Sequence, residues 1–423
     1  MGTEIKNTKA FYSKEIPSDW EVKKLGDCCL VKGEYGINAP AVEFSNDLPA
    51  YLRITDIDDD GNYSTDKKAS VGDPNYEQFI LKNGDIVFAR TGATVGKTYL
   101  YKPTDGILVF AGFLIRFRTI EEILTSQHLK YFTETKHYWD WVKTVSMRSG
   151  QPGINAEEYA SLKIPLPPLP EQKAIAQVLS TADAAIHTTQ KLIAQKELRK
   201  KWLMQQLLTG KKRLKGFGGE WKEVHIRDIA KEVSIRNKSD KQLTVLSCTK
   251  YDGLVPSLEY FGRKIFADDV STYKIVPKNH FAYATNHIEE GSIGYQDILD
   301  EALISPMYTV FKTDKTVNDD FFYKLLKSHP LVYQYQNRME GSIDRRGGLR
   351  WDGFSIIKIK LPSYKEQTAI AQVLQAADKE ISLLKAKADK LREQKKGLMQ
   401  VLLTGKKRLN YDSSDFNDYN ENK

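Results

Sequence analysis

The sequence is poor in cysteine and has no long apolar run, and these two absences exclude several classes of protein. Only three of its 423 residues are cysteines, and two of them, Cys28 and Cys29, are adjacent. They cannot build a disulfide framework, and they lack the spacing of a zinc site. The sequence has no run of about 18 apolar residues that could span a bilayer, and its first residues lack the apolar core of a signal peptide. We therefore expect a cytoplasmic protein that makes no contact with membranes.

Catalytic motifs are missing as well. The segment "TGATVGKT" (residues 91–98) has one residue too few between Gly92 and Gly96 for a phosphate-binding loop, and the following "TYLY" predicts a strand where that loop needs a helix. The segment "DPNY" (residues 73–76) resembles the catalytic loop of adenine methyltransferases, but its second proline is absent. We predict a glycine-rich hairpin tip at the first segment, a turn at the second, and neither a catalytic residue nor a metal site in this chain.

The sequence does contain an internal duplication. "LLTGKKRL" occurs at residues 207–214 and again at residues 402–409, which lie 195 positions later. The match extends backwards without a gap, so that residues 171–214 share 24 of 44 positions with residues 366–409. The chain therefore carries two copies of one module.

Each copy of the module predicts a long helix with one apolar stripe. Glycines at 210 and 405 stop the two helices, Ser363 with Glu366 forms a capping box for the second, and prolines before residue 171 fix the start of the first. About 38 residues of helix span about 57 Å, which corresponds to roughly 17 base pairs of DNA. A helix with a single apolar stripe needs a partner, and the other copy is the obvious one. We expect an antiparallel pair whose seam repeats every seven residues. Its packing residues are Ile175, Leu179, Ile186, Leu203, Ile370, Leu374, Ile381, Leu384, Leu391 and Leu398.

The positive charge of the chain is confined to these modules. The net charge is +8, and residues 171–214 and 366–409 carry +6 and +5, whereas residues 410–423 carry −3. The remaining chain is therefore neutral. A basic helix either faces solvent or lies along a polyanion.

The segments between the helices predict two related globular domains. Each begins with a similar frame, "DWEVKKLGD" (residues 19–27) and "EWKEVHIRD" (residues 220–228), and continues with strand-like runs such as "GDIVFAR" and "HFAYAT". The sequence thus predicts a mixed α/β (α+β) fold. Two globular domains are joined by two long antiparallel coiled-coil helices in a pseudo-twofold, duplicated arrangement.

This organisation resembles that of the specificity subunit of type I restriction-modification systems. The resemblance rests on the duplicated plan, on "PLPPLPEQKAIAQVLSTAD" at the start of the first helix and on "LLTGKKRL" at its end. "IPSDWEVKKLGD" matches the usual start of that family's first recognition domain. The second copy departs from the pattern, because "LPSYKEQ" replaces the proline-rich start. The resemblance covers residues 16–410.

The resemblance implies domain boundaries, a function and partners. It implies an N-terminal tail (1–15), target recognition domain 1 (16–162), conserved helix 1 (163–214), target recognition domain 2 (215–359), conserved helix 2 (360–410) and an acidic tail (411–423). Each recognition domain would read one half of a bipartite target in double-stranded DNA, and the helices would set the spacer. Two methyltransferase subunits would dock on this non-catalytic chain and methylate adenine at N6 with S-adenosylmethionine. Restriction subunits, driven by ATP with Mg²⁺, would join them.

Residues that read DNA are predicted from side-chain chemistry. Arginine bonds guanine through two hydrogen bonds, and asparagine or glutamine pairs with adenine. Solvated surface side chains are the alternative explanation for each of these residues. The candidates lie in glycine-rich loops: Arg90, Lys97, Arg148 and Gln151 in the first domain, and Asn286, His287, Arg345, Arg346 and Arg350 in the second.

Two other functions remain open at this stage. The chain could be a coiled-coil scaffold that binds proteins rather than DNA through its globular ends. It could also be a self-contained modification enzyme that uses "DPNY", although we find no site for the methyl donor. Retention of DNA by the assembled complex would count against the scaffold. Binding of S-adenosylmethionine by the isolated chain would support the modification enzyme.

Overall fold

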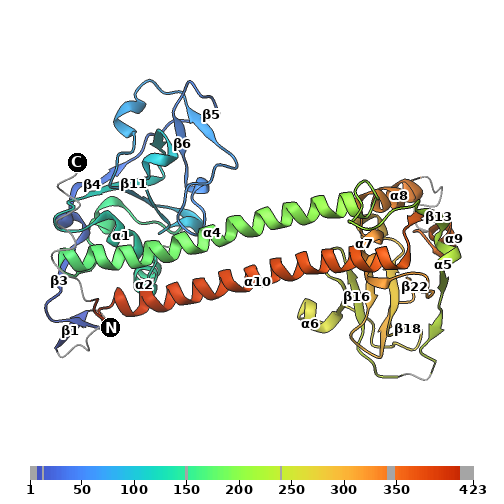
Figure 1. Ribbon diagram of the computed structural model, residues 1–423. Coiled ribbons are helices and arrows are strands. Elements are labelled where there is room, and N and C mark those ends of the chain that lie inside the picture. Colours follow the sequence, from blue (N-terminus) through green and yellow to red (C-terminus); the bar gives the residue numbers. More distant parts are fainter. Residues whose placement is uncertain (1–6, 12–13, 148–150, 239–240, 341–347, 410–423) are drawn as a thin grey trace. The chain divides into compact units, whose positions relative to one another are not determined.

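The computed structural model describes residues 7–11, 14–147, 151–238, 241–340 and 348–409 (Figure 1). The chain forms two units, which are described separately below. Unit 1 consists of the described parts of Met1–Thr189 and Lys387–Lys423, and unit 2 of Gln190–Ala386. Among the helices of the described residues, none is both long enough and apolar enough to cross a membrane.

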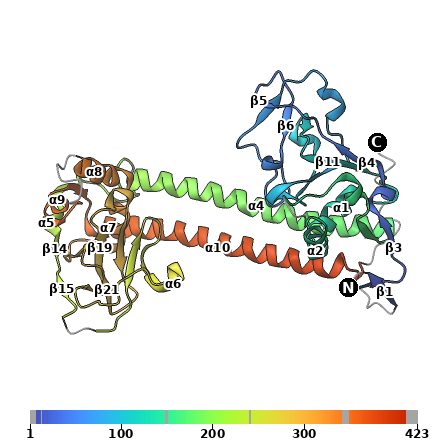
Figure 2. The same ribbon diagram turned by 180° about the vertical axis from the view of Figure 1, so that it is seen from behind.

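Two helices of 39 residues each contribute one half to each unit: α4 (Leu169–Leu207) and α10 (Tyr364–Leu402). In unit 1 the first half of α4 packs against the last half of α10, and in unit 2 these roles are exchanged (Figures 1 and 2). The helices therefore run antiparallel within each unit, as the sequence predicts. Beyond each helix, Gly210 and Gly405 adopt φ values of 69° and 68°, a left-handed conformation that favours glycine and turns the chain away.

The apolar stripe of the helices lies where they face each other and the two domains. Ile175 and Leu179 belong to a buried cluster with Leu402 in unit 1. Ile370 and Leu374 join Leu207 in the core of unit 2. Among the residues predicted to pack the helices, the buried ones are Ile175, Leu179, Ile186, Ile370, Leu374 and Ile381, and the partly buried ones are Leu203, Leu384, Leu391 and Leu398.

The domain of unit 1 is built on two four-stranded sheets with the orders β4-β11-β8-β9 and β10-β6-β7-β5. Short helices cover the first sheet, and a two-stranded pair, β12-β3, leads into α4. The strands are β3 (Glu21–Lys24), β4 (Cys29–Tyr35), β5 (Ala41–Glu43), β6 (Ala50–Leu52), β7 (Ala69–Val71), β8 (Asp85–Ala89), β9 (Thr98–Leu100), β10 (Leu108–Phe110), β11 (Leu114–Thr119) and β12 (Lys163–Leu166). The helices are α1 (Ser126–Thr133), α2 (Lys136–Val145) and α3 (Ala156–Ala160).

The domain of unit 2 repeats this plan with a sheet of order β14-β22-β19-β20 and smaller groups β15-β18-β21, β16-β17 and β13-β23. Its strands are β13 (Lys222–His225), β14 (Ala230–Glu232), β15 (Ile235–Arg236), β16 (Leu246–Thr249), β17 (Gly253–Pro256), β18 (Lys274–Pro277), β19 (His280–Ala284), β20 (Ile293–Gln296), β21 (Glu301–Ile304), β22 (Tyr308–Thr313) and β23 (Lys358–Leu361). Its helices are α5 (Ile226–Ile229), α6 (Ser257–Phe261), α7 (Asp319–Leu326), α8 (His329–Glu340) and α9 (Trp351–Ser355).

The 195-residue spacing of the helical modules extends into the domains. β8 and β19 begin 195 positions apart, and so do α3 and α9, and β12 and β23. The central sheets have the same strand order when each strand of unit 1 is matched to its counterpart in unit 2. The faint similarity of the two globular segments therefore reflects a common fold.

Unit 1 begins with a hairpin that the described residues of unit 2 do not repeat. An antiparallel hairpin, β1 (Thr8–Phe11) with β2 (Lys14–Pro17), begins in the stretch that the resemblance assigns to an N-terminal tail (1–15) and ends two residues beyond it. Phe11 and Ile16 from this hairpin form a small buried cluster with Trp20. Counted back from Trp221, which matches Trp20 in the repeated frame, the corresponding residues form the exit of α4 and contain no strand.

Candidate nucleic-acid interface

The glycine-rich segment of unit 1 is the tip of the hairpin that joins β8 and β9, as the sequence predicts. Gly92 and Gly96 adopt φ values of 72° and 88°, which side-chain-bearing residues rarely accept. A Cβ atom at Gly96 would lie 2.7 Å from Val142 of α2, and the Tyr138 hydroxyl donates a hydrogen bond of 2.7 Å to the Gly96 carbonyl. The tip is therefore held against α2 in one conformation.

Arg90 and Gln151 lie on two segments that are joined at the base of this tip. The segment before α3 pairs with the tip, because the Ile154 amide donates to the Arg90 carbonyl at 2.9 Å and the Gly92 amide donates to the Pro152 carbonyl at 3.0 Å. The Arg90 guanidinium lies 4.8 Å from the centre of the Tyr35 ring, a cation–π contact that orients it. Gln151 is exposed and lies beside Gly92. Two side chains suited to base edges thus lie on neighbouring, hydrogen-bonded segments.

Lys97 has a different environment. Its Nζ atom lies 2.6 Å from the Asp59 carboxylate, so its charge is already balanced by an acid within the domain. Arg148, which the sequence also proposes for this surface, lies outside the described residues. The structure therefore ties the segments that carry Arg90 and Gln151 to each other and places Lys97 in an ion pair.

Unit 2 builds the same arrangement between β19 and β20. The Leu349 amide donates to the Thr285 carbonyl at 2.8 Å, and these residues lie 195 positions after Ile154 and Arg90. Gly348 is required there, because a Cβ atom would lie 2.6 Å from the Thr285 carbonyl oxygen. Asn286 and His287 are exposed on the loop that follows. Arg350 is exposed at the start of α9, whereas Arg345 and Arg346 lie outside the described residues.

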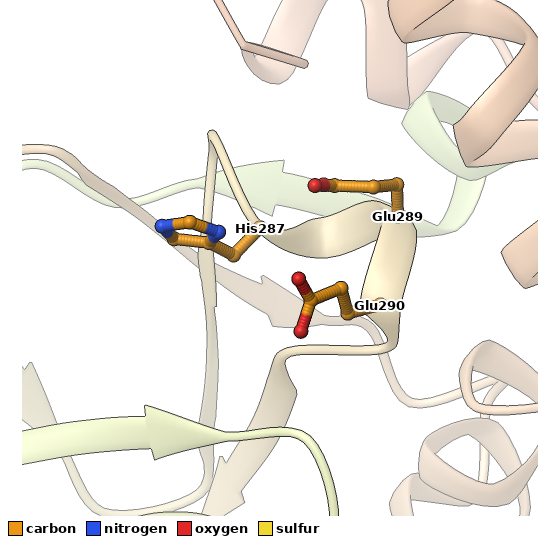
Figure 3. A group of neighbouring side chains, drawn as sticks. All are labelled: His287, Glu289 and Glu290. Atoms are coloured by element: carbon orange, nitrogen blue, oxygen red, sulfur yellow. The ribbon is translucent and has the colours of Figure 1, made fainter.

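Acidic side chains distinguish the loop of unit 2. Ligand atoms of His287, Glu289 and Glu290 lie within 4.8 Å of one another (Figure 3). His287 and Glu290 are exposed, while Glu289 is partly buried. These carboxylates repel phosphate groups, but a carboxylate accepts a hydrogen bond from the N4 amino group of cytosine. The chemistry of this loop therefore suits base edges better than the DNA backbone.

An arginine–glutamate pair closes each unit. In unit 1, Arg408 from the second "LLTGKKRL" donates to both carboxylate oxygens of the buried Glu171 at 2.6 and 2.7 Å. The Trp20 indole donates to the same carboxylate at 3.2 Å, and Asp19 accepts two further bonds from Arg408. In unit 2, Arg213 from the first "LLTGKKRL" donates to Glu366 at 2.5 and 2.6 Å. The Glu366 carboxylate is therefore engaged by Arg213, and the predicted capping box keeps only the bond from the Glu366 amide to the Ser363 hydroxyl.

A second pair of charges bridges the helices at equivalent positions. In unit 1, Asp183 of α4 contacts Lys395 of α10 at 2.7 Å and also Lys130 of α1. In unit 2, Asp378 of α10 contacts Lys200 of α4 and Lys324 of α7. Lys395 and Lys200 are therefore paired with acids rather than left in an apolar environment.

These ion pairs change the acidity of the two aspartates. Burial raises the pKa of Asp183, but Lys130 and Lys395 lower it by more, so that the pKa lies below its usual value. The pKa of Asp378 is lowered in the same way by Lys200 and Lys324. Both carboxylates are therefore charged in the folded protein at neutral pH.

Sequence reasoning missed both sets of pairs. Their signal was present, because Glu171, Asp183, Lys200 and Arg213 each recur 195 positions later within the duplicated module. Charged residues that are retained in both copies of a repeat suggest contacts that are made in both copies.

The comparisons with known proteins agree with this architecture. A protein family described as "Type I restriction modification DNA specificity domain" matches residues 17–197 and again residues 218–393. The type I restriction enzyme MjaVIII specificity subunit of Methanocaldococcus jannaschii is 27% identical over 95% of this chain and 96% of its own length. The putative type I restriction enzyme MjaX specificity subunit of the same organism is 28% identical over 93% of this chain and 95% of its own length.

Solved structures show the same fold at lower identity. The HsdS subunit from Thermoanaerobacter tengcongensis is 16% identical, covers 93% of this chain and 99% of its own, and gives a TM-score of 0.52. The type I restriction-modification S subunit from M. genitalium is 14% identical, covers 93% of this chain and 98% of its own, and gives a TM-score of 0.56.

The chain belongs to the family of type I restriction-modification DNA specificity proteins, with the family's domain present twice. It is a DNA specificity subunit of a type I restriction-modification system, and catalysis resides in the other subunits. This membership favours DNA recognition over the scaffold that binds only proteins. The "DPNY" segment (residues 73–76) forms a turn. The Asp73 carboxylate accepts a hydrogen bond from the Asn75 amide at 2.8 Å, and the backbone carbonyl of Asp73 accepts one from the Tyr76 amide.

Proposed function

We propose that the domains of units 1 and 2 each read one half of a split double-stranded DNA target in the major groove. The observation that carries this proposal is the loop that recurs 195 residues apart, tied by the Ile154–Arg90 bond in unit 1 and the Leu349–Thr285 bond in unit 2. Two readers of one construction, on a chain with antiparallel helices, suit two half-sites of opposite direction. Helices α4 and α10 then set the spacer between the half-sites.

The base contacts come from the side chains on these loops. In unit 1, Arg90 is oriented by Tyr35 and suits guanine, and the neighbouring Gln151 suits adenine. In unit 2, Asn286 suits adenine, and Arg350 suits guanine or a phosphate. His287, Lys97, Arg148, Arg345 and Arg346 complete the set of proposed DNA contacts.

Much of the electrostatic affinity for DNA comes from the partner subunits together with the basic helices, rather than from the recognition domains. The domains are close to neutral and the helical modules hold the positive charge. Because non-specific affinity depends on phosphate neutralisation, the isolated chain should bind DNA weakly. Tight binding by the isolated chain, with a steep dependence on salt, would show this part of the proposal to be wrong.

The catalytic partners are two methyltransferase subunits, which bring S-adenosylmethionine for N6-adenine methylation. Restriction subunits that use ATP and Mg²⁺ join them when DNA is cut. This proposal is supported by a solved structure that describes complex assembly and conformational transition of the type I restriction-modification system. A chain of that structure has this fold, with a TM-score of 0.53 at 15% identity. The complex would act in the cytoplasm.

A selection experiment tests the proposal. The assembled complex is incubated with a random library of duplex DNA, and the retained molecules are sequenced. The proposal expects two conserved half-sites separated by a gap of constant length. Retention without any enriched sequence, or no retention at all, would favour the protein-binding scaffold.

A further inference from the structure

A short turn precedes the central strand β11 of unit 1 and leaves an aromatic side chain in solvent. The Leu114 amide donates to the Ala111 carbonyl at 2.8 Å, which closes the turn around Gly112 and Phe113. The Phe113 side chain belongs to a residue that is 58% exposed. Glycine, proline and small polar residues dominate tight turns, so a phenylalanine at this position calls for an explanation.

Unit 2 builds the same turn before β22. The Tyr308 amide donates to the Ser305 carbonyl at 3.1 Å, and the third residue of the turn is Met307, which is 59% exposed. The two turns are equivalent in the fold, because the last residue of β8 pairs with Leu114 and the last residue of β19 pairs with Tyr308. Their sequences, "AGFL" and "SPMY", share no residue. Both nevertheless carry a large apolar side chain at the third position.

Both turns lie beside the loops that the proposed function assigns to DNA reading. In unit 1 the Arg90 amide donates to the Phe113 carbonyl at 3.0 Å. In unit 2 the Thr285 hydroxyl donates to the Met307 carbonyl at 2.9 Å. The carbonyls of Arg90 and Thr285 also hold the segments before α3 and α9. Each turn is therefore at the same end of the central sheet as its loop and is tied directly to it.

The major groove offers an apolar side chain a specific partner. Base edges there present hydrogen-bond donors and acceptors together with the C5 methyl group of thymine, which apolar side chains contact. A phenylalanine ring gains free energy when it covers such a methyl group and excludes water from it. A methionine side chain does the same and adapts its shape to the contact. An exposed apolar residue beside a polar reading loop thus suits an A·T pair.

We propose that Phe113 and Met307 each contact the C5 methyl group of a thymine in the half-site read by their own domain. This inference rests on the proposed function, since it adds a specificity-determining contact to the same two loops. Arg90 in unit 1 and Asn286 in unit 2 bind hydrogen-bonding groups of the bases, whereas Phe113 and Met307 detect the methyl group that marks thymine.

Removal of the methyl group from the DNA tests the inference. The half-sites are first defined by the selection experiment with the assembled complex. Each thymine of the selected target is then replaced in turn by deoxyuridine, which lacks the methyl group but forms the same base pair. We expect binding by the unaltered complex to weaken about fourfold at one position in each half-site, the factor for one buried methyl group. The complex with Phe113→Ser should lose this sensitivity in one half-site, and the complex with Met307→Ser should lose it in the other.

Ile107→Ser and Ile298→Ser are the matched controls. These isoleucines are 63% and 73% exposed, but Ile107 precedes β10, whereas the unit 1 turn follows that strand. Ile298 follows β20, whose last residue pairs with the first residue of β19, at the end of the sheet opposite to the Met307 turn. Both control complexes should keep the full sensitivity to deoxyuridine. Because all four side chains are exposed, the serine variants should fold like the unaltered chain, which thermal unfolding checks.

The outcomes separate this inference from the proposed function. If the unaltered complex selects no sequence, the proposed function fails, and the inference fails with it. If two half-sites are selected but deoxyuridine weakens binding at no position, only the inference is overturned. The same holds if deoxyuridine has an equal effect on the unaltered complex and on the complexes with Phe113→Ser and Met307→Ser. A selected half-site without thymine on either strand would overturn the inference for the domain that reads it.

Discussion

At the scale of single residues, the repeated "LLTGKKRL" has a definite role in each unit. Its arginine reaches a buried glutamate at the start of the other long helix, Glu171 for Arg408 and Glu366 for Arg213. Each contact joins residues more than 150 positions apart. The motif therefore occurs twice because each unit contains the end of a long helix that starts in the other unit, and the arginine that follows this end forms the ion pair.

Removal of Arg408 should strongly destabilise unit 1. Arg408→Ala leaves the Glu171 carboxylate buried with only the Trp20 indole as a donor. The loss of one partner from a buried ion pair costs about 3–5 kcal/mol, which denaturant unfolding would measure. Lys407→Ala is the control, because this neighbouring lysine is exposed. Equal stability of the two variants would show that the pair contributes nothing.

Acid should weaken the contacts between the helices as the pH falls below 3.8. The pKa values of Asp183 and Asp378 are lowered in the folded chain from the ordinary value of 3.8. Their contribution to stability is therefore complete above pH 3.8 and is lost as the pH falls below it through the folded pKa. Thermal unfolding followed from pH 7 to pH 3 should show this loss. The variant with Asp183→Asn and Asp378→Asn should be less stable at pH 7 and should depend less on pH below 3.8.

Arg90 should affect the choice of sequence more than overall affinity. Loss of a bidentate contact to guanine reduces discrimination at that base pair by about 1–3 kcal/mol. Arg90→Lys keeps the charge but loses the planar fork, so it should relax specificity at one position of one half-site with little change in the salt dependence of binding. The measurement compares DNA variants of the selected target bound by the assembled complex. A uniform loss of affinity for every sequence would instead identify Arg90 as a phosphate contact.

At the scale of elements, the sequence predicts what is local or repeated. Both long helices, their stops at Gly210 and Gly405, and the strands around "GDIVFAR" and "HFAYAT" follow from periodicity and turn residues. The hairpin at residues 8–17 was not predicted, because it is short and because its apolar side chains pack against α10 and Trp20 rather than against neighbours in a periodic pattern. Pairing between strands and between charges distant in sequence could not be derived either, since single-sequence patterns carry no information on distant partners.

The lysines in the helical seam provide a test of pairing between elements. Lys200→Asp places a second carboxylate beside Asp378, so this variant should be destabilised. Adding Asp378→Lys restores opposite charges between the helices and should recover part of the stability. Recovery should remain incomplete, because Lys324 then faces a lysine. A double-mutant cycle on denaturant unfolding gives the coupling energy, and a coupling of zero would exclude a contribution from this pair.

At the scale of the whole molecule, duplication explains the organisation of the chain. The duplication of one domain and one long helix yields two domains with the same central sheet, two equivalent loops and two equivalent sets of ion pairs. The loops proposed to read DNA differ in their residues, with Arg90 and Gln151 in one and Asn286, His287 and two glutamates in the other. Under the proposed function, the two halves of one DNA target can therefore differ in sequence while the protein repeats its fold.

The most direct test of this account is a map of methylated adenines in the genome that carries this gene. Single-molecule sequencing compares the genome with the gene intact and with the gene deleted, with expression of the methyltransferase subunit verified in both. The account predicts that deletion abolishes methylation at one split motif, which has a methylated adenine in each half and a gap of constant length. Loss of methylation at a continuous motif, or no change at any motif while the methyltransferase is active, would contradict it.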